Sequence, residues 1–478
     1  MKKTKIICTM GPRTNDKIIL KELIASGMNI ARFNFSHGSH EEHAQRIALV
    51  REVASELGVP VALMLDTKGP EIRTGILKDG KRVQLEKGSD FVLYTDEREG
   101  DETGCSITYQ QLVYDVRKGD KILIDDGLIG LEVKKVSADR IECVVSNGGE
   151  LGERKGVNVP NVKVNLPGVT AKDREDILFG IEQGVDFIAA SFVRNSDCIM
   201  DIREILEENH GRDIDIIAKI ENAEGVENID EILDEADGIM VARGDLGVEI
   251  PADEVPYIQK MIIRKCNRKC KPVVTATQML DSMIRNPRPT RAEAGDVANA
   301  IYDGSDVIML SGETAMGKYP VEAVRMMAKI AETTEEHLDY DKLQKFNKKQ
   351  RKKDISMAVG FASVSTAESL RASCLVVPTM TGYTARMISS LRPKTPIYAI
   401  SPNEKAVRKM QMYWGIHPLL GETEDSTRHM IANSMKIVVR KKLIKKGELA
   451  VFTAGDPATN MVTGRGRSTN VMQVVEAK

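Results

Sequence analysis

The stretch that decides the fold is IIAKIENAEGVENIDEILDEADGIMVARGDLG, residues 216–247. It opens with a short apolar run that ends in Lys219 and Glu221, passes through an acidic segment with helical spacing, and closes with a second apolar run that leads to Asp245. Two buried strands joined by a helix form a βαβ unit, and its parallel strands end at the same edge of a sheet. The pattern therefore predicts that Lys219, Glu221 and Asp245 share one rim.

The chemistry of this rim suits phosphoryl transfer. Two carboxylates hold Mg²⁺, and an ammonium group meets the charge of a phosphoryl group in flight. The alternative interpretation is a surface lysine beside two solvated acids. Their positions at two successive strand ends favour the functional interpretation, because active sites on parallel barrels are built from strand ends.

Composition limits the class of protein. The chain has 478 residues, of which 42% are hydrophobic and 29% charged, which is typical of a soluble globular protein of two or three domains. A net charge of -2 gives no overall attraction to nucleic acid or to an anionic membrane. Seven cysteines without CxxC pairs indicate a reducing compartment. No apolar run reaches the roughly 18 residues of a membrane span, so we expect a cytoplasmic protein.

Strands and helices alternate on both sides of the opening stretch. Each predicted strand is a short apolar run, and each predicted helix is an amphipathic segment. The predicted strands cover residues 5–10, 28–33, 59–65, 185–191, 216–220, 238–242, 272–276 and 307–310, with helices at 17–26, 40–57, 171–183, 196–209, 258–268 and 291–303. Eight such units favour a closed (β/α)₈ TIM barrel, and an open doubly wound sheet is the alternative.

Two other regions break this alternation. Residues 70–169 contain short strand-like pieces divided by Gly and Asp turns, which predicts an inserted small β-barrel lid domain. After a basic segment, 345–353, which we interpret as a solvated linker, a last α/β domain covers 354–478, with strands near 375–379, 397–401 and 449–453. The predicted catalytic barrel is thus formed by residues 1–69 and 170–343.

The barrel prediction gathers a polar surface at the carboxyl ends of its strands. Its members follow apolar strands or end them. They are Arg32, Asn34, Ser36, Asp66, Lys68, Ser191, Lys219, Glu221, Asp245, Thr277, Ser311 and Glu313.

Six motifs on these strand ends closely resemble the pyruvate kinase family, over essentially the whole chain. They are ARFNFSHG at 31–38, LDTKGPEIRTG at 65–75, AKIEN at 218–222, VARGDLGVEIP at 241–251, TATQMLDSM at 275–283 and LSGETAMGKYP at 310–320. The resemblance implies a TIM barrel with a lid and a C-terminal regulatory domain. It also implies a homotetramer that transfers phosphate from phosphoenolpyruvate to ADP, giving pyruvate and ATP, the last step of glycolysis. The chain ends soon after Val475, so we expect none of the additional C-terminal domain of some bacterial members.

The resemblance also implies roles by position. Lys219 matches the residue that stabilises the transferred phosphoryl group, and Arg32 matches the one that grips the phosphate of phosphoenolpyruvate. Glu221 and Asp245 match the ligands of Mg²⁺ (or Mn²⁺). The remaining substrate contacts of the family correspond to Gly244, Asp245 and Thr277. We therefore expect Lys219, Arg32 and Thr277 to be catalytic. The donor of the proton to the enolate stays open between Thr277 and a water chain near Ser311 and Glu313.

Further positions match the potassium and nucleotide contacts of the family. The K⁺ set is Asn34, Ser36, Asp66 and the Thr67 carbonyl, and Glu71 stands where K⁺-dependent members carry Glu. The nucleotide set is Arg73, Lys155, Asn34 and His37.

Two loops match the region where regulated members bind a phosphorylated effector. Their residues are Thr379, Thr381, Gly382, Thr384, Arg465 and Arg467. An unregulated domain with ordinary turns is the alternative. Two other functions remain open: a Mg²⁺-dependent barrel lyase or aldolase acting on pyruvate or phosphoenolpyruvate, and a sugar-phosphate sensor that has lost catalysis.

Overall fold

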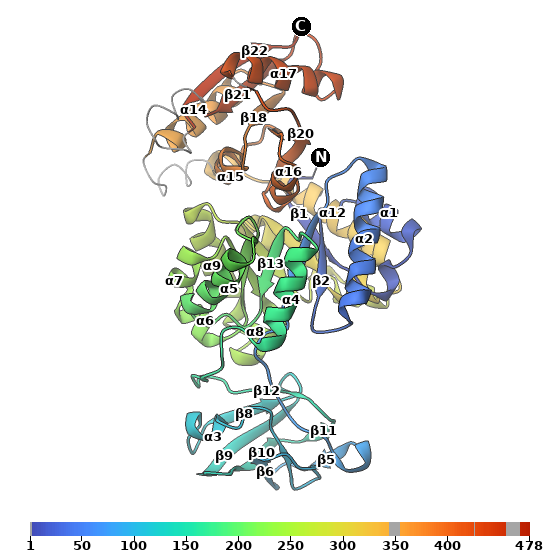
Figure 1. Ribbon diagram of the computed structural model, residues 1–478, viewed down its shortest axis with the longest axis vertical. Helices are drawn as coiled ribbons and strands as arrows, with labels where there is room; N and C mark the ends of the chain where they lie inside the picture. The colour runs from blue at the N-terminus through green and yellow to red at the C-terminus, as the bar shows by residue number, and fades with distance from the viewer. Residues whose placement is uncertain (1, 344–353, 425, 456–468) are drawn as a thin grey trace.

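The structure, a computed structural model, describes residues 2–343, 354–424, 426–455 and 469–478. Three bodies follow one another along the long axis of the molecule (Figure 1). The barrel lies in the middle, the inserted β-rich body at one end and the C-terminal sheet at the other.

The central body is a closed barrel of eight parallel strands, as the sequence predicts, and the open-sheet alternative is wrong. The strands are β1 (Lys5–Thr9), β2 (Ile30–Asn34), β3 (Ala62–Asp66), β13 (Phe187–Ala190), β14 (Asp215–Ile220), β15 (Gly238–Ala242), β16 (Val273–Ala276) and β17 (Val307–Leu310). Their order around the barrel is β1-β17-β16-β15-β14-β13-β3-β2.

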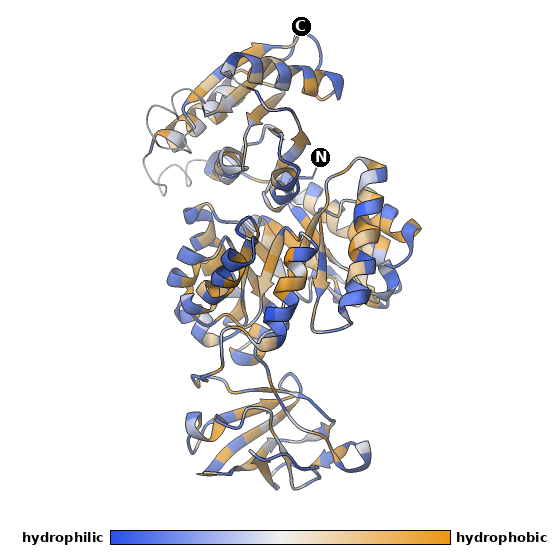
Figure 2. Cartoon of the chain, viewed as in Figure 1, coloured by the Kyte–Doolittle hydropathy of each residue, from blue (hydrophilic) through white to orange (hydrophobic). Residues whose placement is uncertain are grey.

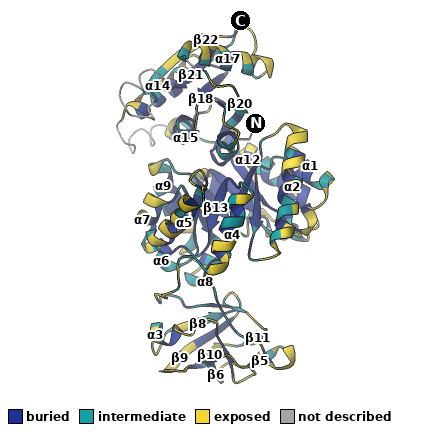
Figure 3. Cartoon of the chain, viewed as in Figure 1, coloured by how far each residue is buried: buried dark blue, intermediate teal, exposed yellow. Residues whose placement is uncertain are grey.

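Alternate residues of each strand fill the barrel, while their neighbours pack under the helices. Ile30, Met64 and Ile217 belong to the interior cluster. Ala31 and Leu63, one position along, pack with the helical layer instead. Because side chains alternate between the faces of a strand, the next inward positions after Ile30, Met64 and Ile217 are Arg32, Asp66 and Lys219. The strands thus carry an apolar layer inside the barrel and a charged layer at their carboxyl ends. Figures 2 and 3 show the apolar, buried strands surrounded by more polar helices.

Helices surround the barrel and begin at residues suited to capping. Side chains of Asp16, Ser39, Thr170 and Thr290 accept backbone N–H groups at four of these starts. The helices are α1 (Lys17–Ala25), α2 (His40–Leu57), α4 (Ala171–Glu182), α5 (Ser196–Glu208), α6 (Ala223–Glu227), α7 (Ile229–Glu235), α8 (Arg243–Glu249), α9 (Val255–Lys269), α10 (Arg291–Asp303), α11 (Gly312–Ala315) and α12 (Pro320–Glu336). Among the described residues no helix combines the length and apolarity that crossing a bilayer requires.

The acidic segment between β14 and β15 is predicted as one helix, but the structure divides it into two. It forms α6 and α7, which meet at Asn228. Asn228 has φ -91° and ψ 14°, outside the helical range, so it ends one helix and begins the next. The change of direction lets Ile229 and Ile232 reach the barrel core.

The insert is a β domain with its own core, which includes Phe91, Leu131 and Ile141. Its main sheet has the order β4-β12-β8-β9-β10-β6-β7, and a bridge between Thr74 and Ile107 joins the two outer ends. This bridge closes the sheet in the manner of the predicted small barrel. Its elements are β4 (Ile72–Arg73), β5 (Val83–Leu85), β6 (Asp90–Tyr94), β7 (Gly104–Ser106), α3 (Leu112–Asp115), β8 (Lys121–Ile124), β9 (Ile129–Ser137), β10 (Arg140–Asn147), β11 (Gly149–Leu151) and β12 (Gly156–Asn158).

The C-terminal body is a five-stranded sheet of order β20-β19-β18-β21-β22. Its elements are α14 (Ile355–Ser369), β18 (Cys374–Pro378), α15 (Tyr383–Ser390), β19 (Ile397–Ser401), α16 (Glu404–Lys409), β20 (Ile416–Leu420), α17 (Thr427–Arg440), β21 (Leu449–Ala454) and β22 (Val471–Glu476). The sequence prediction omits β20 and β22, the two outer strands. Edge position explains both omissions, since β20 tolerates Pro418 there and β22 exposes most of its side chains.

Salt bridges fasten α16 to the edge of the barrel at which the strands begin. Arg408 pairs with Asp186 at 3.0 Å, and Lys409 pairs with Asp215 at 2.5 Å. Asp186 is fully buried, and it also accepts the backbone N–H of Leu63 at 2.9 Å. Both acids stand just before or at the start of strands whose other ends carry the polar layer, so the C-terminal body braces β13 and β14 at their amino-terminal ends.

This brace predicts a stability effect. Asp186→Ala leaves the Arg408 guanidinium and the Leu63 N–H without their shared acceptor. We therefore expect the free energy of unfolding to fall by roughly 3 kcal/mol. The fluorescence of Trp414, the single tryptophan and a buried residue, reports urea unfolding.

The matched control is Asp230→Ala, which removes an exposed ion pair with Lys265. It should lower the free energy of unfolding by less than about 1 kcal/mol. Equal unfolding midpoints for Asp186→Ala and the wild type would contradict a bracing role for the pair.

Candidate functional site

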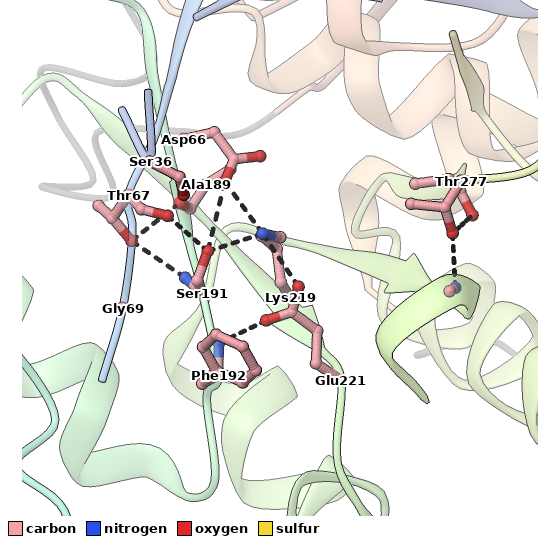
Figure 4. A network of polar contacts seen from close by, with 12 residues as sticks. Ser36, Asp66, Thr67, Gly69, Ala189, Ser191, Phe192, Lys219, Glu221 and Thr277 are labelled. Carbon is pink, nitrogen blue, oxygen red and sulfur yellow. Dashed lines mark hydrogen bonds and ion pairs between the residues drawn. The ribbon is translucent and has the colours of Figure 1, made fainter. Parts of the chain in front are cut away.

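Lys219 lies at the centre of the polar layer, at the carboxyl end of β14 (Figure 4). Its Nζ donates to Asp66 Oδ1 at 2.9 Å and to Ser191 Oγ at 2.6 Å, and it forms an ion pair with Glu221 Oε1 at 2.9 Å. These partners come from strand ends far apart in sequence. Burial lowers the pKa of Lys219, but the charges of Asp66 and Glu221 outweigh it and raise the pKa above its ordinary value. The ammonium is therefore fixed and permanently charged.

Asp66 joins Lys219 to Arg32. Its Oδ2 accepts Arg32 Nε at 2.6 Å, and Arg32 Nη1 donates to Thr9 Oγ1 at 2.9 Å. Burial raises the pKa of Asp66, but the two neighbouring cations prevail and hold it below the usual range. One carboxylate thus orients both cations that the family resemblance relates to phosphate.

Glu221 and Asp245 form the acidic side of the site. Glu221 Oε2 accepts the backbone N–H of Phe192 at 2.6 Å. Burial raises the pKa of Glu221 to about 7; Lys219 opposes the shift and Asp245 adds to it. Burial also raises the pKa of Asp245. Glu221 is buried and Asp245 half-buried, and two such carboxylates that repel one another fit a cation, because a bound positive charge removes the cost of ionising both.

Thr277 and Gly244 meet at the neighbouring strand ends. Thr277 Oγ1 accepts the Gly244 N–H at 2.7 Å, at the start of α8. Thr277 has φ 65°, a left-handed conformation that is strained for a β-branched residue. The sequence indicates both residues, but nothing in it shows the strain, which holds the hydroxyl against α8.

The predicted potassium set also comes together. Asn34 stands opposite Asp66 in the β2–β3 register, and Asn34 Oδ1 accepts the Ser36 N–H at 3.2 Å. The Thr67 carbonyl follows Asp66 directly and accepts a hydrogen bond from Ser191 Oγ at 2.6 Å. The set therefore offers carboxylate, amide, hydroxyl and carbonyl oxygens, the donors that hard cations prefer.

The candidates for protonation differ in how they are held. Both carboxylate oxygens of Glu313 accept backbone N–H groups, from Ser311 at 2.7 Å and from Leu280 at 3.1 Å. Burial raises the pKa of Glu313. Thr277 Oγ1 donates to the Ala276 carbonyl at 2.7 Å. The carboxylate of Glu313 is thus held by two backbone donors, whereas the Thr277 hydroxyl lies between the Gly244 N–H and the Ala276 carbonyl.

A cavity of about 380 Å³ lies between the insert and the barrel and is lined by residues of both. Arg73 and Lys155 line it from the insert, and Asp245 lines it from the barrel. Arg73 pairs with Glu71 at 2.6 Å, and Lys155 pairs with Asp125 at 2.9 Å. The cavity wall, as described, includes neither Asn34 nor His37, and the latter is exposed beyond β2. The geometry therefore brings together two of the four nucleotide candidates.

A larger cavity of about 660 Å³ opens in the C-terminal body. Thr379, Thr381 and Thr384 line it, and Thr379 Oγ1 accepts the N–H of Gly382 at 3.1 Å. Arg465 and Arg467 lie outside the described residues. The sequence reasoning omitted Lys436 and Arg440, which also line the cavity from α17. Their i, i+4 spacing is the signal that places both on one helix face.

Comparison with known proteins agrees with this geometry. Residues 1–324 match the pyruvate kinase barrel domain, and residues 357–475 match the pyruvate kinase alpha/beta domain. The chain is 51% identical over 475 residues to a pyruvate kinase of Clostridium acetobutylicum, covering 99% of each chain. It is 53% identical over 475 residues to one of Geobacillus stearothermophilus, covering 99% of this chain and 80% of that one.

A solved structure shows the same agreement in three dimensions. The crystal structure of a pyruvate kinase from Cryptosporidium parvum superposes with a TM-score of 0.95 at 41% identity, covering 100% of this chain and 96% of that one. With both domains matched and half of the residues shared along the whole chain, this chain belongs to the pyruvate kinase family, whose members are phosphotransferases.

Proposed function

We propose that this chain transfers the phosphoryl group of phosphoenolpyruvate to ADP and produces pyruvate and ATP. The observation that carries the proposal is the buried ammonium of Lys219, held between Asp66 and Glu221 and next to a second cation, Arg32. Preorganised positive charge of this kind stabilises the negative charge of a phosphoryl group in transit.

Each side of the site has a part in this reaction. Arg32 binds the phosphate of the substrate through its planar set of donors. Gly244 and Thr277 orient the carboxylate end. Arg73 and Lys155 hold the nucleotide phosphates, and closure of the insert over the barrel excludes water, so that ADP and not hydroxide receives the phosphoryl group.

Two kinds of ion complete the proposed site. Glu221 and Asp245 would hold Mg²⁺ (or Mn²⁺), which supplies charge between the two phosphate-bearing substrates. Among the described residues no cluster of three or more His, Cys, Asp or Glu side chains forms a metal cage. Two protein carboxylates leave coordination positions for substrate oxygens, which suits Mg²⁺ in such enzymes. The oxygens of Asn34, Ser36, Asp66 and Thr67 would hold K⁺.

Two other functions explain less of the structure. A lyase or aldolase accounts for Glu221 and Asp245, but it leaves Arg73 and Lys155 across the cavity without a polyphosphate to bind. A sensor without catalysis needs only the C-terminal cavity, and it leaves the paired charges around Lys219 without a role.

Regulation is a further part of the proposal. The hydroxyls of Thr379, Thr381 and Thr384 and the cations of Lys436 and Arg440 line one cavity, which suits a phosphorylated effector. The family resemblance supports a homotetramer as the regulated form. Sigmoidal kinetics made hyperbolic by one phosphorylated metabolite would support this regulation, and effector-independent kinetics would favour an unregulated domain.

The direct test is pyruvate formation from phosphoenolpyruvate, ADP and Mg²⁺, with and without K⁺. Turnover that requires ADP supports the kinase. Release of pyruvate without ADP would favour the lyase, and no turnover under any of these conditions would favour the sensor.

Lys219→Met removes the central charge and keeps an unbranched side chain. Turnover should fall roughly a thousandfold or more, while phosphoenolpyruvate still binds, because the lost interaction is strongest in the transition state. Steady-state kinetics and equilibrium binding measure the two effects, with the exposed-pair variant Lys265→Met as control. Near-normal turnover would remove Lys219 from the mechanism.

Glu71→Lys tests the monovalent site. It places a fixed cation near the proposed K⁺ oxygens, so the stimulation of turnover by K⁺ should shrink severalfold. Glu71→Gln removes the charge without adding one and is the matched control. An unchanged K⁺ requirement in Glu71→Lys would contradict the assignment.

Asp125→Asn tests the nucleotide side. The change releases Lys155 from its 2.9 Å pair, so ADP should bind roughly two- to fivefold more tightly, with the KM for phosphoenolpyruvate unchanged. The control is Asp90→Asn, which breaks the exposed pair with Lys134 elsewhere on the insert. Equal ADP affinity in Asp125→Asn and Lys155→Met would place the nucleotide away from this pair.

A further inference from the structure

We propose that Ser191 is a positioning residue: its hydroxyl fixes the direction of the Lys219 ammonium and ties it to the Thr67 carbonyl. The inference rests on the proposed function. It gives a role to Ser191, to which neither the sequence motifs nor the charge pattern gave one.

The fold holds Ser191 in one place. It follows β13 directly, two positions after Ala189, so it continues the inward row of that strand. The residue is 5% exposed, and its N–H donates to Thr67 Oγ1 at 3.1 Å. Gly69 lies against it: a Cβ there would stand 2.8 Å from Ser191 Cβ. The backbone and the side chain of Ser191 are therefore both fixed before any substrate binds.

The donor and the acceptor in each hydrogen bond of the Ser191 hydroxyl can be assigned. An ammonium has no acceptor, so Lys219 Nζ donates to Ser191 Oγ at 2.6 Å. The single hydroxyl proton then goes to the Thr67 carbonyl at 2.6 Å, in preference to Asp66 Oδ1 at 3.3 Å. The result is a directed chain from Lys219 through Ser191 to Thr67, visible in Figure 4.

Ser191 differs from the other two partners of Lys219. Asp66 and Glu221 are charged and attract the ammonium strongly, whereas the serine oxygen is neutral. A lysine side chain is flexible, and three acceptors together define where its three protons point. The serine supplies the third direction without adding negative charge opposite an incoming phosphate. Its loss should let the ammonium settle toward the carboxylates, away from the transition-state charge.

The same hydroxyl reaches the proposed potassium site. Its acceptor, the Thr67 carbonyl, is one of the four oxygens in that set. A donated hydrogen bond fixes the direction of the carbonyl dipole and leaves a second lone pair for a cation. Ser191 thus connects the cation oxygens to the phosphoryl-transfer lysine through two hydrogen bonds.

The first test separates positioning from binding. Ser191→Ala should lower kcat about ten- to a hundredfold, the range for losing a hydrogen bond to a charged group. The directly measured Kd for phosphoenolpyruvate should change by less than about threefold. Ser191→Cys keeps the volume with a weakly bonding thiol and should lose turnover similarly. Ser191→Thr, which retains a hydroxyl, should recover most of the activity.

The matched control is Ser389→Ala. Ser389 is also buried, and its Oγ donates to a carbonyl, that of Trp414, at the same 2.6 Å, but in the C-terminal body. Its turnover should match the wild type. Wild-type kcat in both Ser191→Ala and Ser191→Cys, or an equal loss in Ser389→Ala, would overturn the inference.

A double-mutant cycle shows whether Ser191 acts through Lys219. In the Lys219→Met background, Ser191→Ala should have no further effect on kcat. A full, additive loss in that background would overturn the inference while leaving the proposed function intact. Near-normal turnover of Lys219→Met alone would remove Lys219 from the mechanism and overturn the inference with it, whereas failure of the wild type to form pyruvate from phosphoenolpyruvate and ADP would contradict the proposed function.

Binding of K⁺ gives a readout that is independent of activity. The K⁺ concentration for half-maximal thermal stabilisation of the substrate-free protein should rise several-fold in Ser191→Ala and stay unchanged in Ser389→Ala. An unchanged K⁺ response in Ser191→Ala would overturn the connection to Thr67.

Discussion

The structure depends on one buried chain of charges that runs from Arg32 through Asp66 and Lys219 to Glu221. Removing four charged groups from water is costly unless each finds a partner in good geometry. Here each cation meets a carboxylate within 2.9 Å. The Lys219 ammonium also donates to the Ser191 hydroxyl, and Glu221 also accepts the N–H of Phe192. Removing one member would leave its direct partner buried with less compensation, so each of the four groups depends on its neighbours in the chain.

The barrel makes this chain possible. Its strands bring residues about thirty to one hundred and fifty positions apart to one layer, above an apolar interior that excludes water from beneath. The amino-terminal ends of β13 and β14 are held in turn by Asp186 and Asp215 through α16. The strands that lead to Ser191 and Lys219 are therefore fixed at both ends, by the charge chain at their carboxyl ends and by the C-terminal body at their amino-terminal ends.

Much of this arrangement follows from the sequence. Apolar runs that end in polar residues predicted the barrel, and positions at the strand ends predicted that Arg32, Asp66 and Lys219 share a rim. Position at a strand end does not say which neighbours pair, so the contact between Ser191 and Thr67 needed the tertiary structure. Three other features could not be predicted from the sequence: the break at Asn228, the edge strands β20 and β22, and the strained φ of Thr277. Tertiary packing decides them against local preference.

The central claim is that Lys219, held by this chain, faces the phosphoryl group that moves. The most direct measurement is a crystal structure with phosphoenolpyruvate or a nonreactive analogue, Mg²⁺ and K⁺. The account predicts a phosphate oxygen within hydrogen-bond distance of Lys219 Nζ and Arg32, and a metal ion between Glu221 and Asp245. A phosphate bound elsewhere, with the contacts of Lys219 to Asp66, Ser191 and Glu221 unchanged, would contradict it.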